Sequence, residues 1–157
     1  MTFNLNVMIL GLCTAAGLMA ADVTSAAGTP KQTADQLLAE AKATRVASLD
    51  LATQLKAKNA NLAKVTDDVA AIEKSAGAIH SLVQQLESHK SQLTPRQQAE
   101  LTNVKQLSEL LHVFLDNKKT LVAHGAGPED RERIRLYAKS VADRAEMLEK
   151  TLRRMAM

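Results

Sequence analysis

The chain has 157 residues, of which 46% are apolar and 24% are charged, and its formal net charge is +3. This length and balance are typical of one folded domain rather than of a disordered chain. It contains two Phe, one Tyr and no Trp, with few Gly and Pro residues. That composition argues against a β-sandwich or barrel, and against a protein that stacks single-stranded bases on aromatic rings.

The N-terminal segment from Leu5 to Ala21 is apolar and carries no charge. It is shorter than the roughly 20 residues that a membrane-spanning helix needs. Ser25 and Ala27 then occupy the two small-residue positions of an A-x-A-like cleavage site before Gly28. These features predict a signal peptide followed by a short linker, and therefore export to the bacterial periplasm or medium.

The predicted signal peptide covers residues 1–27 and the linker residues 28–32. Because no Lys or Arg precedes the apolar core, an uncleaved anchor is the alternative interpretation. Cys13 is the only cysteine and lies within this segment. A processed chain would therefore have no disulfide, no thiolate metal ligand and no cysteine nucleophile.

From Pro30 onward the chain is rich in helix-forming residues, and apolar side chains recur at spacings of three and four. This period places one apolar stripe on each helix and leaves the other faces polar, so we predict an all-α fold. The stripe consists, in chain order, of Leu37, Ala41, Thr44, Ser48, Leu51, Leu55, Leu62, Val65, Val69, Ile72, Ala76, Ile79, Val83, Leu86, Leu101, Val104, Leu107, Leu111, Phe114, Leu121, Ile134, Ala138, Val141, Ala145, Leu148, Leu152 and Met155.

Two clear breaks interrupt the stripe. Thr94, Pro95 and Gln97 have the arrangement of an N-cap, a first-turn proline and a capping-box partner. Glycines at 125 and 127 followed by Pro128 end one helix and open the next. A third, weaker break lies at residues 58–61 (KNAN). The predicted helices span approximately residues 33–58, 62–91, 95–122 and 128–155.

The weak break leaves two architectures open. The heptad phase runs unbroken from Leu37 to Leu93, so residues 33–91 would form one rod of roughly 88 Å in a long helical hairpin or coiled coil. Four segments of similar length, and lysines at stripe positions near the expected helix ends, favour an antiparallel up-down four-helix bundle instead. Those lysines are Lys58, Lys90 and Lys118.

Histidines are the only candidate metal ligands that the spacing brings near one another. In an antiparallel hairpin that turns at residues 93–95, His80 and His112 lie about one helical turn apart. Glu109 precedes His112 by three residues, which is the Glu-x-x-His spacing of di-iron bundles, but the motif occurs only once. We interpret both histidines as structural hydrogen bonders, and a metal- or haem-binding bundle that uses His80, His112 and Glu109 is the alternative.

Other chemistry is not indicated. No Ser-His-Asp arrangement, phosphate-binding glycine loop or covalent haem motif is present, so we predict no enzyme activity and no cofactor. Basic and acidic residues alternate along the last helix, as on a solvated face. We therefore expect no nucleic-acid binding and, at most, weak association with a membrane surface.

Residues 93–97, LTPRQ, resemble the LTxxQ motif of periplasmic stress chaperones. The match covers five residues and occurs once, whereas that family usually carries the motif twice. The resemblance implies an exported helical chaperone. Together with the stripes and the predicted leader, it leads us to expect a cofactor-free exported bundle that acts by protein contact, as a scaffold or chaperone, through an unknown protein partner or self-association.

Overall fold

The computed structural model describes residues 28–57, 62–116 and 128–156. Within these ranges the chain is helical and no residue lies in a strand, which confirms the all-α prediction. The described elements are α1 (Pro30–Gln54), α2 (Leu62–Ser88), the 3-10 helix η1 (Lys90–Gln92), α3 (Pro95–Asp116) and α5 (Pro128–Met155). The predicted signal peptide over residues 1–27 lies outside the described residues.

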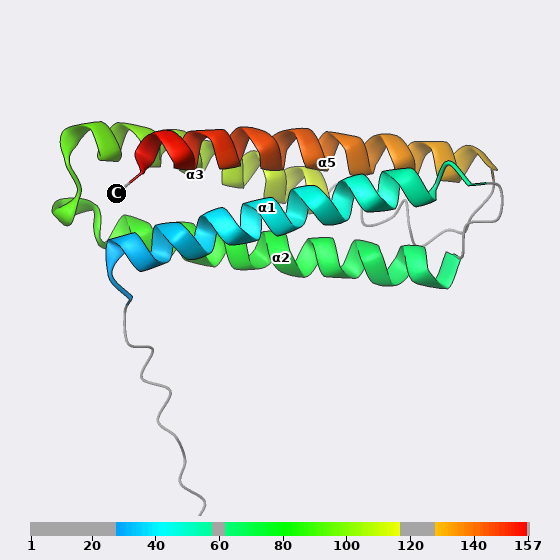
Figure 1. Cartoon of the computed structure of the whole chain (residues 1–157), viewed down its shortest axis with the longest axis horizontal. Helices are drawn as coiled ribbons and strands as arrows, with labels where there is room; N and C mark the ends of the chain where they lie inside the picture. The colour runs from blue at the N-terminus through cyan, green and yellow to red at the C-terminus, as the bar shows by residue number, and fades with distance from the viewer. Residues whose placement is uncertain (1–27, 58–61, 117–127, 157) are drawn as a thin grey trace, which may run out of the picture.

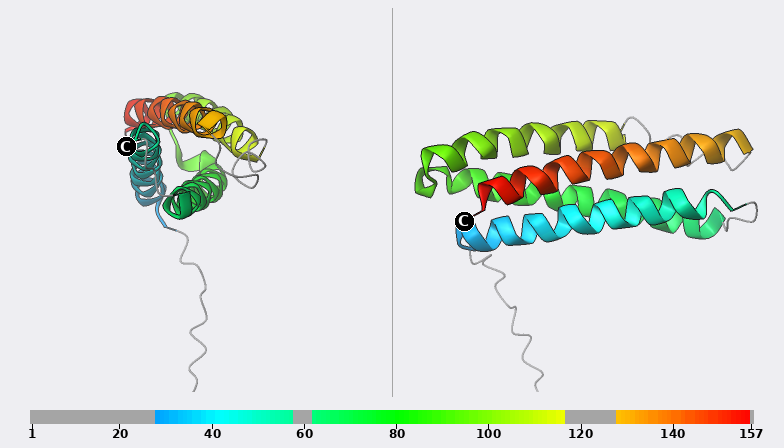
Figure 2. Two further views of the ribbon diagram at one scale, coloured as in Figure 1. Left: turned by 90° about the vertical axis from the view of Figure 1, so that its right-hand side faces the viewer. Right: turned by 45° about the horizontal axis from the view of Figure 1, so that its top comes forward.

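The four α-helices pack side by side, and each runs opposite to the one before it (Figure 1). Each helix has two neighbours: α1 packs against α2 and α5, and α3 packs against the same two helices. Figure 2 shows this arrangement along the helix axes, with α1 beside α5 and α2 beside α3. The start of α1 and the end of α5 therefore lie at the same end of the molecule.

The alternative prediction of one continuous helix over residues 33–91 is wrong. α1 ends at Gln54 and α2 begins only at Leu62, so the weak sequence break separates two helices. The last turn of α1 tightens, because the backbone N–H groups of Lys56 and Ala57 donate to carbonyls three residues earlier. No glycine or proline is needed for this ending, which explains why the sequence signal is weak.

Two capping boxes fix the helix starts at the end where α1 and α3 begin. The Thr94 hydroxyl accepts a 3.3 Å hydrogen bond from the Gln97 backbone N–H, and the Gln97 side chain accepts a 2.9 Å bond from the Thr94 N–H. This confirms the predicted start of α3. The sequence analysis missed the same arrangement at Thr29 and Gln32. α1 consequently begins at Pro30, ahead of the expected residue 33.

The end of α2 also differs from its expected bound, whereas the expected end of α3 falls outside the described residues. α2 ends at Ser88 rather than residue 91, because η1 takes up the start of the turn into α3. Lys90 is exposed in η1, whereas Lys58 and Lys118 lie outside the described residues. α3 is described as far as Asp116, so its expected end at residue 122 also lies outside them. α5 has the expected bounds.

The apolar stripe forms the core. All of its positions whose side chains are described are buried, except Leu107 and Phe114, which are half-buried and pack against the core. Leu62 and Leu121 are not among those side chains. Burial of each large aliphatic side chain contributes about 1.5–3 kcal/mol. The spacing of the apolar residues therefore determines both where the helices form and which side chains pack between them.

Between α1 and α2 the core contains one chain of polar contacts. Thr44, which is fully buried, donates a 2.9 Å hydrogen bond to the Ser75 hydroxyl, and Ser75 donates a 2.6 Å bond to Glu40. This chain of bonds carries the buried hydroxyl of Thr44 out to a carboxylate, so its burial does not leave an unsatisfied donor. The stripe of α1 can therefore include a threonine without a large cost.

Between α3 and α5 the packing is aromatic. The rings of Phe114 and Tyr137 stack with centroids 5.4 Å apart, and the Arg144 guanidinium lies 4.1 Å above the Phe114 ring. Tyr137 is buried, and burial together with the charge of Glu73 raises the pKa of its hydroxyl. Its phenol therefore stays neutral and serves as packing.

Candidate functional site

The α2/α3 interface brings together the two histidines that the sequence singles out. The rings of His80 and His112 stack with centroids 5.3 Å apart and planes inclined by 23°. His80 is half-buried and His112 is exposed. The two residues are therefore in contact, at a separation that agrees with the roughly one helical turn that the sequence predicts.

The turn between the two helices explains this register. The same register pairs Glu87 on α2 with Lys105 on α3, whose charged groups are 3.0 Å apart. Hydrogen bonding to Glu87 raises the pKa of the Lys105 ammonium, so the pair stays charged near neutral pH. A short connection with a capped helix start leaves the two helices little freedom to slide, so the contact between residues 80 and 112 follows from the turn.

Glu109 does not join the histidine pair. It is exposed on α3, where it lines a shallow hollow with Gln106, Leu110 and Val113. Across residues 28–57, 62–116 and 128–156, no group of three or more His, Cys, Asp or Glu side chains is arranged to hold a metal ion. The structure thus brings together two of the three candidate residues.

The other two histidines lie elsewhere. His89 follows the last residue of α2, where the Gln92 amide nitrogen is 3.4 Å from its Nδ1 atom. His124 is outside the described residues.

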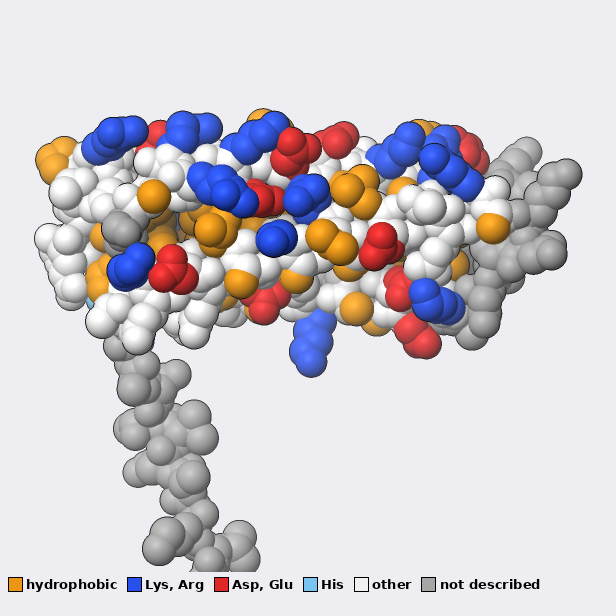
Figure 3. Space-filling model, in the orientation of Figure 1, with side chains coloured by type: hydrophobic (Ala, Val, Ile, Leu, Met, Phe, Trp, Pro, Cys, Tyr) orange, Lys and Arg blue, Asp and Glu red, His pale blue; other side chains and the backbone are white. Residues whose placement is uncertain are grey.

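A second candidate site is a groove between the first turns of α1 and the last turns of α5, with a volume of about 370 Å³. Its apolar lining comes from both helices, and charged side chains stand at its rim. Figure 3 shows apolar side chains in the hollow between these helices near the left end of the view. The lining residues are Lys31, Ala34, Asp35, Leu38, Leu152, Arg153, Met155 and Ala156.

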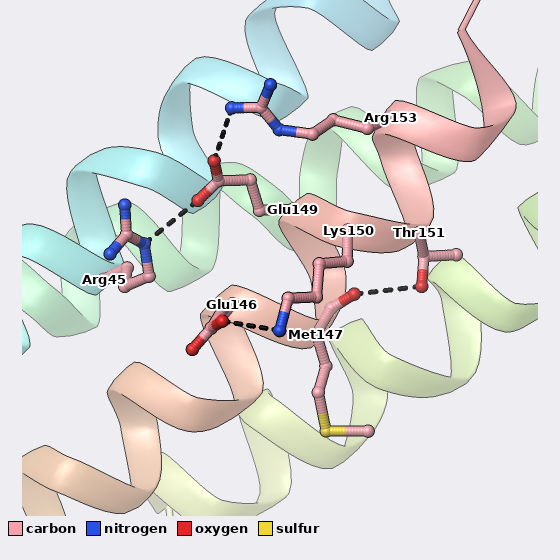
Figure 4. A network of polar contacts seen from close by, with 7 residues as sticks. All are labelled: Arg45, Glu146, Met147, Glu149, Lys150, Thr151 and Arg153. Atoms are coloured by element: carbon pink, nitrogen blue, oxygen red, sulfur yellow. Dashed lines mark hydrogen bonds and ion pairs between the residues drawn. The ribbon is translucent and has the colours of Figure 1, made fainter.

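An ionic bridge beside the groove ties α1 to α5. The Glu149 carboxylate, whose side chain is only 9% exposed, accepts a 3.0 Å hydrogen bond from Arg45 on α1. It accepts a second, 2.7 Å bond from Arg153, one turn further along α5 (Figure 4). The Arg153 hydrogen bond, and that of Arg45, lower the pKa of Glu149 although burial acts in the opposite direction. The bridge therefore keeps a charged carboxylate at a buried position.

Arg153 is part of both the ionic bridge and the groove. Its guanidinium binds Glu149, and its side chain stands at the rim of the groove. A charged donor is thus held at the groove by a partner that is itself fixed to α1. By contrast, Glu146 pairs at 2.6 Å with Lys150 on the same helix, and the Glu146 and Lys150 side chains are 46% and 64% exposed (Figure 4).

Sequence reasoning found the histidine pair but missed the groove. The pair follows from spacing about a single turn. The groove depends on the register between α1 and α5, which are far apart in the chain. One signal was available, because Ala34 and Leu38 form a second apolar pair beside the main stripe at a spacing of four. Such a flank is expected to face a neighbouring helix.

Comparison with known proteins identifies no relative: no protein-family model, curated protein or solved structure matches this chain. In the part of the chain that the structure describes, none of the helices combines the length and the hydropathy needed to cross a bilayer.

Proposed function

We propose that this chain is an exported, cofactor-free and non-enzymatic antiparallel helical bundle that acts by contact with another protein. In this proposal the groove between α1 and α5 receives an apolar segment of that partner. The single observation that carries the proposal is the lining of the groove, which is apolar at its floor and charged at its rim.

The groove has properties that favour a peptide segment. Its volume of about 370 Å³ accommodates a few apolar side chains, and each buried apolar Å² contributes about 25 cal/mol to binding. Lys31, Asp35 and Arg153 offer charges of both signs at the rim, which would orient a polar backbone or flanking side chains. Helices or extended segments commonly bind in grooves of this kind.

The chaperone form of the proposal rests on this groove rather than on the LTPRQ segment. Thr94 and Gln97, two of the three defining residues of that motif, form the capping box of α3. Their side chains therefore already form the hydrogen bonds that cap the helix start. Apolar surface for an unfolded client is supplied instead by Ala34 and Leu38, which are half-buried and line the groove.

The decisive experiment measures aggregation of a reduced, unfolded model protein by light scattering. We expect the purified chain to slow aggregation at near-stoichiometric ratios, and L38D to weaken this effect strongly. V46D is the matched control, because Val46 is an exposed apolar residue on the same helix that does not line the groove. Circular dichroism establishes that each variant is folded.

L38W provides a second test that keeps the groove apolar. The larger indole would fill the groove, so client protection should fall although no charge is introduced. If L38D and L38W protect the client as well as the unmodified chain does, the groove is not the binding surface. Static light scattering at several concentrations tests the alternative occupant, a second copy of this chain, which would give a concentration-dependent mass.

Export is tested separately. We expect the protein recovered from outside the cytoplasm of a bacterial host to begin at Gly28, as the predicted cleavage site requires. N-terminal sequencing that finds Met1 in the exported protein would contradict the signal peptide. Retention of the chain in the cytoplasm would contradict the proposed periplasmic or secreted location.

A further inference from the structure

We propose that His80 and His112 form a two-histidine site for a divalent transition-metal ion, with Zn²⁺ and Cu²⁺ as the ions best suited to it. The two rings come from different helices and are already in contact, with centroids 5.3 Å apart. Imidazole nitrogen is a preferred ligand of both ions. This site is on the α2/α3 interface, so it is independent of the groove between α1 and α5.

The separation of the rings is the one that a shared ion requires. A tetrahedral ion bound at about 2.1 Å to one nitrogen of each ring holds the two ring centroids roughly 5 Å apart. The observed 5.3 Å centroid distance therefore needs rotation of the rings but no movement of the helices. The rings now stack with their planes inclined by 23°, so binding requires each ring to turn about its side-chain bonds until one nitrogen of each points to the ion.

The surrounding packing holds the two histidines in place. Each is next to a stripe residue that is almost completely inaccessible, Ile79 on α2 and Leu111 on α3. The short turn into α3 fixes the register of the same interface, and the Glu87–Lys105 pair is formed in that register. The backbone positions of both histidines are therefore set before any ion arrives, which reduces the ordering cost of binding.

The His80 ring already has a hydrogen-bond partner on its own helix. The Gln84 amide nitrogen lies 3.0 Å from Nε2 of His80. When that amide donates, Nε2 carries the lone pair, which is the form of imidazole that binds a metal. An ion would replace this hydrogen bond. Because His112 is exposed, water completes the coordination shell, and the affinity should be below that of a site with three protein ligands.

An ion bound to both rings would link α2 to α3 in the folded chain but not in the unfolded chain. It should therefore raise the melting temperature by mass action. We expect ZnCl₂, at about ten times its dissociation constant, to raise the melting temperature by roughly 3–8 °C. Addition of EDTA should reverse the rise.

Three single variants decide whether the pair is responsible. H80Q and H112Q should each abolish the zinc-dependent rise, because one remaining imidazole cannot link the helices. H89Q is the matched control, since His89 is a histidine near the same interface but outside the pair, and it should keep the full rise. Their melting temperatures without metal show that the variants are folded.

Electron paramagnetic resonance with Cu²⁺ gives a second measurement that does not depend on stability. The unmodified chain and H89Q should show coupling to two imidazole nitrogens, and H80Q and H112Q to fewer. Absence of a zinc-dependent rise in the unmodified chain would overturn the proposal, and so would a rise that persists in both H80Q and H112Q. L38D should bind zinc normally, so failure of the groove proposal is distinguishable from failure of this one.

Discussion

The α1/α5 and α2/α3 interfaces lie on opposite sides of the bundle and are held together by different chemistry. α1 and α5 are far apart in the chain, and the buried Glu149 carboxylate of α5 bridges them through Arg45 of α1, while Arg153 of α5 is its second partner. α2 and α3 are joined by a short turn, and their polar contacts are the partly exposed pair Glu87–Lys105 and the stacked histidines.

This difference follows from how each interface gets its register. A short turn fixes the register of α2 and α3, so contacts between their surfaces need not be strong. Helices that are distant in the chain receive no such help, and specific buried contacts between them set their alignment. The α2/α3 interface is therefore free to present polar groups to solvent, whereas the α1/α5 interface uses polar groups for structure.

The largest expected effect tests the core beneath the α1/α5 interface. Leu148 is completely buried on α5, so L148A should lower the free energy of unfolding by about 2–5 kcal/mol. L136A, at a 51% exposed position of the same helix, is the control and should change it little. Guanidinium unfolding measures both. Equal effects would show that α5 does not bury its stripe.

The next effect tests the buried bridge. E149Q should lower the free energy of unfolding by about 1–3 kcal/mol, because it weakens charge-assisted hydrogen bonds to Arg45 and Arg153. E146Q is the control, since the hydrogen bond of Glu146 is an exposed one to Lys150 on its own helix, and its effect should be much smaller. Equal losses for the two variants would place the bridge among ordinary surface pairs.

Acid should act on this bridge in a defined direction. The folded pKa of Glu149 is lowered, so its contribution to stability is complete above the unfolded pKa and is lost as the pH falls through the folded value. E149Q should therefore show a weaker loss of stability between neutral and acidic pH than the unmodified chain. An unchanged pH profile would contradict the assignment.

A smaller effect tests the turn that sets the α2/α3 register. T94A removes the hydroxyl that caps α3 and should lower the free energy of unfolding by about 1 kcal/mol. T94S keeps a hydroxyl and should retain most of the stability. If T94A is neutral, the capping box does not hold the start of α3.

The smallest expected effect concerns the exposed pair of the α2/α3 interface. The side chains of Lys105 and Glu87 are 45% and 35% exposed, so E87Q should lower the melting temperature only slightly. Salt at about 1 M should remove the difference between E87Q and the unmodified chain. D67N, which changes an exposed carboxylate on α2, is the control. A large effect that resists salt would mean that this interface resembles the α1/α5 interface.

Much of the fold could be predicted from the sequence, because the relevant forces are local. The spacing of residues such as Ile72, Ile79 and Leu86 predicts which face of α2 is buried, and each of them is fully buried. Thr94, Pro95 and Gln97 predict the start of α3 for the same reason, since a cap is a contact between near neighbours.

The rest of the site could not be predicted because it depends on distant pairs. Nothing near Glu149 in the sequence shows that Arg45 would reach it, and Arg153 alone reads as an exposed partner one turn away. The groove depends on the same alignment of α1 with α5. His80 and His112 are an intermediate case, because the turn predicts their proximity but not the stacking of their rings.

The start of α1 and the end of α5 meet at one end of the bundle, where Lys31 and Met155 line the same groove. A few added residues would thus suffice to join Ala156 to Thr29, and new chain ends could be opened after α1 at the exposed residues Lys56 and Ala57. Such a circularly permuted protein would keep every helix intact, and any domain fused to the natural start of α1 or end of α5 would emerge next to the groove.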